Sequence, residues 1–324
     1  MSPPGSDDSL DPPPRLDLPL FVWGPLKPGE PAHEDGLGQF VAEAHPATVA
    51  GGLRYRDGLP LLDPDTDGTV RGTVLAWRRG QEQPAYAAAS AFASRHEHRW
   101  LSTEATLADG GSRTVNALRG RRPRRGSSGE TYPEWSSASE PAFSHGLAGV
   151  REVAVSSATE PFPSVGHDDA TAWSLFYRLH AAYLLGWAAL ERFALLAFGP
   201  AQPPVRRLDR LNEDPAFRSC AVEAGVSPAP KGADSADPYK RVKADGSGAV
   251  YCWDAVRAQV GYGLRSPSRD GALLRRALVE LHDTFRLHLA DRVPAVVSRW
   301  EVLEPGARAD RWLLRPVVSG VGLG

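Results

Sequence analysis

The sequence predicts an α+β protein, with a mostly β first half and an all-helical second half. From residue 18 to about 118, short apolar runs alternate with turns rich in Gly, Pro and Asp, as in strands joined by tight turns. From about residue 169 to the end at 324, apolar residues recur at helical spacing. Residues 119–168 follow neither pattern and are expected to form a linker. Residues 1–17, rich in Pro, Ser and Asp, are expected to be a disordered tail.

Within the first half, the alternation of apolar and polar residues is clearest over 69–77. The alanine-rich segment 86–95 predicts a helix, and Gly110-Gly111 lies at the turn of a closing hairpin. Strands are expected at 20–23, 47–50, 53–55, 69–77, 101–107 and 114–118.

The stretch Leu18–Gly29 is the first candidate for a binding loop. Its apolar run ends abruptly at Gly24-Pro25, and a second turn follows at Lys27-Pro28-Gly29. This pattern indicates a buried strand that leads into a tight loop, where a ligand can approach the exposed backbone. An ordinary strand and turn would have the same pattern.

Composition narrows the class of protein. The chain of 324 residues is long enough for about two domains, and its net charge of −2 gives no general attraction to nucleic acid or to an acidic membrane. Its two cysteines, Cys220 and Cys252, cannot form a disulfide scaffold. The acidic, proline-rich start is unlike a signal peptide. We therefore expect a cytoplasmic protein, and no cofactor or metal is predicted.

The second half is expected to contain three long helices. Asp168-Asp169 can cap the first, which runs to about Phe198, and the others are expected at about 250–264 and from Asp270 onward. The first carries an apolar stripe at 3-4 spacing: Phe176, Leu179, Tyr183, Gly186, Leu190, Phe193 and Ala197.

The first long helix is expected to be buried on both sides. The opposite face carries Trp173, Leu184 and Trp187. A helix apolar on more than one face must be covered twice, so we expect a homodimer through the helical region. Coverage by the barrel or by residues 293–323 is the alternative. Glu191 and Arg192 within the apolar stretch argue against a membrane span.

Residues 20–118 resemble the γ-glutamylcyclotransferase-like family. The loop Trp23-Gly24-Pro25-Leu26 is similar to the family's Tyr-Gly-Ser/Thr-Leu loop. It is followed by Gly52-Leu-Arg-Tyr55, by Gly68-Thr-Val-Arg-Gly-Thr-Val74, and by Glu97 between a helix and an aromatic strand. The resemblance implies a small mixed α/β barrel with a cavity at the strand ends.

In that family the loop backbone holds a carboxylate or oxyanion, and a glutamate acts as general base. The α-amine of a γ-glutamyl group attacks its own γ-carbonyl and releases 5-oxoproline. The resemblance implies the same transferase or lyase chemistry here, with Glu97 as the base and Trp23, Gly24, Pro25 and Leu26 binding substrate.

This chain departs from the pattern at two positions of the loop. Trp23 replaces the tyrosine, and Pro25 has no N–H to donate. Glu104 is a weaker candidate for the base, and Glu97 could also be a surface residue beside Arg95 and Arg99. His96 and His98 flank Glu97, but no third metal ligand is placed by the sequence.

Residues 169–291 resemble, more weakly, a HEPN domain, a helical bundle common in nucleic-acid-directed defence systems. Leu185-Gly-Trp-Ala-Ala-Leu-Glu191 is similar to that family's first helix. Arg257 matches the arginine of its Arg-Asn-x-x-x-His motif, whereas Tyr262 replaces the histidine. We expect no RNase activity, because tyrosine exchanges protons poorly near neutral pH. A buried ion pair between Arg257 and Glu191 is the structural alternative.

The leading functional hypothesis is a γ-glutamylcyclotransferase-like enzyme. The alternative is a non-enzymatic protein whose barrel senses a small molecule and whose degenerate HEPN-like domain dimerises or binds a partner. The third hypothesis is an RNA-directed defence or toxin–antitoxin component, against which Tyr262 argues.

Overall fold

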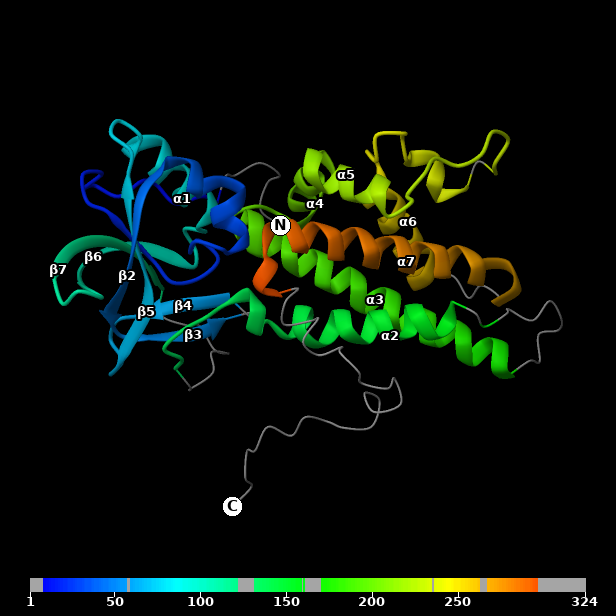
Figure 1. Cartoon of the computed structure of the whole chain (residues 1–324), viewed down its shortest axis with the longest axis horizontal. Coiled ribbons are helices and arrows are strands. Elements are labelled where there is room, and N and C mark those ends of the chain that lie inside the picture. The colour runs from blue at the N-terminus through cyan, green and yellow to red at the C-terminus, as the bar shows by residue number, and fades with distance from the viewer. Residues whose placement is uncertain are drawn as a thin grey trace, which may run out of the picture.

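The computed structural model describes residues 8–56, 59–121, 131–158, 160, 170–234, 236–262 and 267–296. It confirms the α+β class: a closed β-barrel is followed by a helical region (Figure 1). The strands are β1 (Leu20–Val22), β2 (Val41–Ala50), β3 (Gly52–Arg56), β4 (Leu59–Asp63), β5 (Thr69–Trp77), β6 (His98–Leu107) and β7 (Ser112–Gly120). The helices are α1 (Glu82–Phe92), α2 (Leu147–Ser157), α3 (Ala170–Phe198), α4 (Pro204–Glu213), α5 (Pro215–Glu223), α6 (Ala249–Tyr262) and α7 (Pro267–Arg292).

The barrel strands follow the order β1-β5-β2-β6-β7, and β1 closes the barrel by pairing in parallel with β7. Strand β1 also pairs antiparallel with β5, where Phe21 lies opposite Val74. The approach is so close that a Cβ at Gly72 would lie 2.3 Å from the Val22 carbonyl oxygen. Only glycine leaves room for this crossing.

The amino-terminal segment corrects the prediction of a disordered tail for residues 8–17; residues 1–7 lie outside the described part. The Leu10 N–H donates to the Ala93 carbonyl at 3.0 Å, and the Asn116 side-chain amide donates to the Arg15 carbonyl at 2.6 Å. Proline-rich sequence lacks local periodicity, but its backbone can still pair with a neighbouring strand or helix end.

Helix α3 forms the centre of the helical region and packs on α2 and α7 (Figure 1). The predicted stripe from Phe176 to Ala197 is buried, as expected. By length and composition α3 could cross a membrane, since an 18-residue window of it has a mean hydropathy of 1.4, but 61% of that window is buried inside the fold. On its other face Trp187 is buried within the chain and Leu184 is exposed, so coverage of Leu184 by a second subunit stays a prediction.

Two boundaries of the helical region differ from the prediction. The expected linker 119–168 contains α2, whose buried residues Leu147 and Val150 pack within the core. Helix α7 begins at Pro267, three residues before the expected cap Asp270, because proline is well tolerated in the first turn of a helix.

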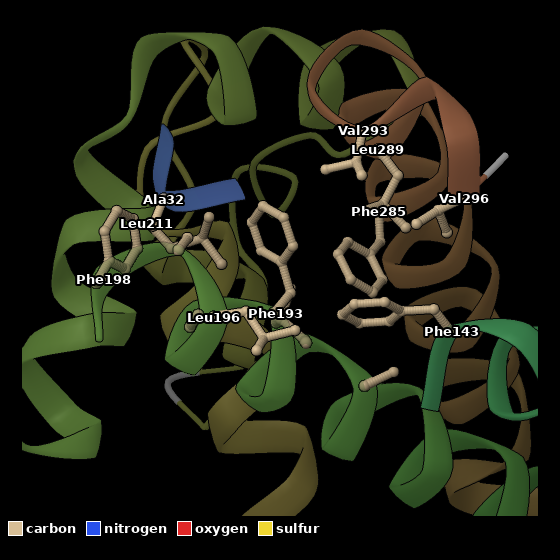
Figure 2. Close-up of a cluster of buried hydrophobic side chains, with 14 of the residues drawn as sticks. Ala32, Phe143, Phe193, Leu196, Phe198, Leu211, Phe285, Leu289, Val293 and Val296 are labelled. Carbon is tan, nitrogen blue, oxygen red and sulfur yellow. The ribbon is translucent and has the colours of Figure 1, made fainter. Parts of the chain in front are cut away.

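The barrel and the helices share one apolar core. Figure 2 shows Ala32, from the barrel's loop region, beside Phe198 of α3 and Leu211 of α4. At the same junction, a Cβ on Gly199 would lie 2.3 Å from the Phe92 carbonyl oxygen, so the end of α3 abuts the end of α1. The end of α1 is thereby held directly against the helical region.

Candidate functional site

The loop after β1 opens into a small pocket of about 30 Å³. A cavity needs about 10–15 Å³ of such space to hold one water molecule, so the pocket has room for a small polar group such as a carboxylate or carbonyl. It is lined by Phe21, Val22, Trp23, Gly24, Pro25, Leu26, Pro60, Phe92, His98 and Leu118. All four loop residues singled out by the sequence therefore lie at the pocket.

Hydrogen bonds within the loop fix its shape. The Gly24 carbonyl accepts from the Lys27 N–H at 3.0 Å, and the Pro25 carbonyl accepts from the His33 N–H at 3.2 Å. The His33 imidazole Nδ1 lies 3.1 Å from the Leu26 carbonyl. The loop thus satisfies its carbonyl groups internally and leaves its N–H groups for other partners.

Two of those N–H groups belong to buried residues that line the pocket. Within the part of the chain that the structure describes, neither the Gly24 N–H nor the Leu26 N–H donates a hydrogen bond. Pro25, between them, has no N–H. Buried backbone donors are rarely left without an acceptor, so this loop is suited to bind an acceptor oxygen.

The walls of the pocket are mostly apolar. The ring of Trp23 stacks on Phe21 with centroids 6.3 Å apart, and Pro60 approaches Gly24 from the neighbouring hairpin. His98, 5% exposed, is the titratable side chain among the lining residues. An apolar wall excludes water and strengthens any hydrogen bond to the loop.

Glu97 lies in the turn between α1 and β6, where the sequence places it. Its backbone is fixed there: the Glu97 N–H donates to the Ser94 carbonyl at 3.1 Å, and its carbonyl accepts from the Arg121 N–H at 2.7 Å. The side chain is half-buried and does not line the pocket, whereas the adjacent His98 does. The candidate base is thus one residue away from the pocket wall.

Glu104, the weaker candidate, lies on the outer surface of β6. Its carboxylate accepts hydrogen bonds from the Thr114 hydroxyl at 2.5 Å and from the Ser112 hydroxyl at 2.7 Å. These bonds lower its pKa. A carboxylate stabilised in this way is a poor general base.

The two histidines beside Glu97 lie in different environments. The His96 imidazole is exposed in the turn, 3.2 Å from Asp8, while His98 is buried at the start of β6. Residues two apart in a strand share one face of the sheet, but His96 precedes β6. The imidazoles of His96 and His98 therefore do not share a face. The described residues contain no group of three or more side chains suited to a metal ion.

A second feature of the loop was missed by sequence reasoning. Residues 131–140, which we call the strap, pair with Leu53 of β3 and Arg71 of β5 and then reach the loop. The Lys27 ammonium donates to the Trp135 carbonyl at 2.8 Å, and the Glu30 carboxylate accepts from the Ser137 N–H at 3.1 Å. Burial raises the pKa of Glu30. No local pattern signals these contacts, because they join residues more than a hundred positions apart.

The HEPN-like motif residues do not form the expected ion pair. Glu191 is exposed on α3, whereas Arg257 donates to Asp254 at 2.7 Å and lies over the Trp187 ring at 5.2 Å. Residues three apart on one helix are neighbours, so Arg257 finds its partner within α6. Tyr262 is the last residue of α6, and its side chain lies outside the described part.

Fold and site together define a small closed β-barrel, with a loop pocket, joined to a helical region. Comparison with protein-family models, with curated proteins and with solved structures gives no match for this chain. The architecture therefore stands on the structure, and both family likenesses remain resemblances.

Proposed function

We propose that this chain is a small-molecule-binding protein, and that the loop Trp23–Leu26 holds a carboxylate or carbonyl oxygen of the ligand. The observation that carries the proposal is the pair of N–H groups of the buried residues Gly24 and Leu26, which have no acceptor in the described part of the chain. The pocket holds the oxygen-bearing group of the ligand, and the remainder of the ligand extends through its open mouth.

Binding without turnover fits the pocket better than cyclotransfer does. The lining residues include no carboxylate, and general-base catalysis needs one within about 3 Å of the proton that it removes. Pro25 also removes a donor that an oxyanion would need, and one such donor is worth about 3 kcal/mol.

Cyclotransfer at a γ-glutamyl amide is the second candidate, because Glu97 directly precedes His98 at the pocket wall. A rotation of the Glu97 side chain toward the mouth would bring a base to a bound substrate. In this reading the loop binds the substrate as proposed above, and Glu97 adds the chemistry.

Calorimetry with 5-oxoproline, γ-glutamyl dipeptides and short-chain carboxylates tests the binding proposal, and release of 5-oxoproline from the dipeptides tests turnover. Pro25→Ala adds an N–H between the two donors and is expected to tighten carboxylate binding several-fold. Pro28→Ala, a proline of the same loop outside the pocket lining, is the matched control. Unchanged affinity in Pro25→Ala, or failure of every oxygen-bearing probe to bind, would contradict the loop as the binding element.

A further inference from the structure

Helix α3 has an apolar face that the described chain leaves uncovered. Tyr177 is 52% exposed and Leu184 is 45% exposed, although the opposite face of the same helix forms the core. Both residues lie on one line along the helix with Ala181, Ala188 and Glu191, at 4-3-4-3 spacing. We call these five residues the outer seam.

The outer seam combines an ordered aromatic anchor with small residues. The Tyr177 ring stacks on Trp173 with centroids 5.7 Å apart and meets His180 edge-on at 6.1 Å. Ala181 and Ala188 let another helix approach closely, as alternating small and large residues do in paired helices. Rigid aromatic side chains of this kind contribute strongly to protein interfaces.

The outer seam carries one polar group on either side of its centre. Within the described chain, neither the Tyr177 hydroxyl nor the Glu191 carboxylate makes a hydrogen bond, although the Glu191 charge lies near enough to interact with Arg207 of α4. Tyr177 precedes Leu184 by seven residues and Glu191 follows it by seven. Each therefore lies two turns, roughly 10 Å, from Leu184.

We propose that a second copy of this chain covers the outer seam through a two-fold axis at Leu184, with the two α3 helices antiparallel. In this arrangement the Tyr177 hydroxyl of each copy donates to Glu191 of the other, and Leu184 meets its own symmetry mate. Parallel pairing would instead place the two Glu191 carboxylates against each other. The polar groups thus select a closed, self-complementary dimer.

A lipid surface is the competing occupant, since α3 is apolar enough to interact with one. Contact with lipid would remove the charged Glu191 and its neighbour Arg207 from water at considerable cost, whereas the antiparallel dimer gives Glu191 a hydrogen-bond donor. The second copy is therefore the occupant that accounts for both the apolar and the polar residues of the outer seam.

The first test is the mass of the full chain by light scattering at micromolar concentration. We expect a dimer, which Leu184→Glu converts to a monomer by placing two carboxylates on the axis. Val205→Glu, at an exposed valine of α4, is the matched control and should stay dimeric. A monomeric wild type, or a dimer that survives Leu184→Glu with unchanged dissociation, overturns the proposal. Association of the wild type with phosphatidylcholine–phosphatidylglycerol vesicles in place of dimerisation also overturns it.

The second test examines the register. Tyr177→Glu places like charges opposite each other and should dissociate the dimer, while Tyr177→Glu combined with Glu191→Lys should restore it. Leu184→Cys should form a disulfide between copies under mild oxidation, and Val205→Cys should not; the native Cys220 and Cys252 are buried. A double variant that stays monomeric, with circular dichroism like the wild type, overturns the antiparallel register.

Discussion

The Glu30 carboxylate and the backbone N–H of Ser137 meet at 3.1 Å, although 107 residues separate them. This bond joins the loop after β1 to the start of the short 3-10 turn at Ser137–Ser139, and Glu30 is only 5% exposed. The loop that forms the pocket therefore also supports the strap, and the conformations of the loop and the strap depend on each other.

Two replacements of Glu30 distinguish the contribution of its hydrogen bond to stability from the contribution of its charge. Glu30→Ala leaves the buried Ser137 N–H without an acceptor and should lower the free energy of unfolding by about 1–3 kcal/mol. Glu30→Gln keeps an acceptor and removes a buried charge, so it should cost less than about 1 kcal/mol. Urea unfolding measures both; equal losses in the two variants would mean that the charge, and not the acceptor, matters.

The ion pair between Arg192 of α3 and Glu140 at the end of the strap is predicted to be sensitive to loss of one partner. Both side chains are nearly buried, and the guanidinium makes bonds of 3.0 and 3.1 Å to the carboxylate. Arg192→Met should destabilise the protein by about 3 kcal/mol, because it removes the guanidinium from a nearly buried carboxylate. The double variant Arg192→Met/Glu140→Met should recover most of that loss; a double variant as unstable as the single one would contradict this explanation.

Stability is predicted to fall in mild acid because of His288. This side chain is 1% exposed, packs against the rings of Phe193 and Phe217, and lies 4.0 Å from Asp214 and near Arg292. Burial lowers its pKa to about 4 from an ordinary value of 6.5. Between these pH values the unfolded chain binds more protons than the folded one, so stability decreases as pH falls.

The loss attributable to His288 should reach about 3 kcal/mol near pH 4. His288→Leu should flatten that part of the stability profile, measured as melting temperature or urea midpoint against pH. A profile of His288→Leu that is parallel to the wild type between pH 6.5 and 4 would show that another group is responsible.

Closure of the barrel is predicted to require Gly72. A methyl group there would meet the Val22 carbonyl at 2.3 Å and the Phe21 ring at 2.6 Å, so β1 and β5 could not keep their pairing. Gly72→Ala should cost about 3 kcal/mol or more. Gly36→Ala, where no atom lies within 4 Å, is the control and should change the melting temperature little.

The sequence by itself determined the class of fold and most of its elements. Alternation marked β5 and helical spacing marked α3, because period-2 and period-3.6 patterns follow directly from which face of an element is buried. The apolar run that stops at Gly24-Pro25 also indicated the position of the loop that lines the pocket. Signals of this kind are local, so they can be read from neighbouring residues alone.

Tertiary structure decided the features that join distant residues. No local sequence pattern predicts that β1 pairs with β7 or that Lys27 and Glu30 hold the strap. Nor does one predict that His98, and not Glu97, lies at the pocket wall. The same holds for the outer seam, because two apolar faces of α3 look alike in sequence until packing on α2 and α7 covers one of them. Burial and hydrogen-bond partners depend on contacts across the whole chain, and these exist only once the chain has folded.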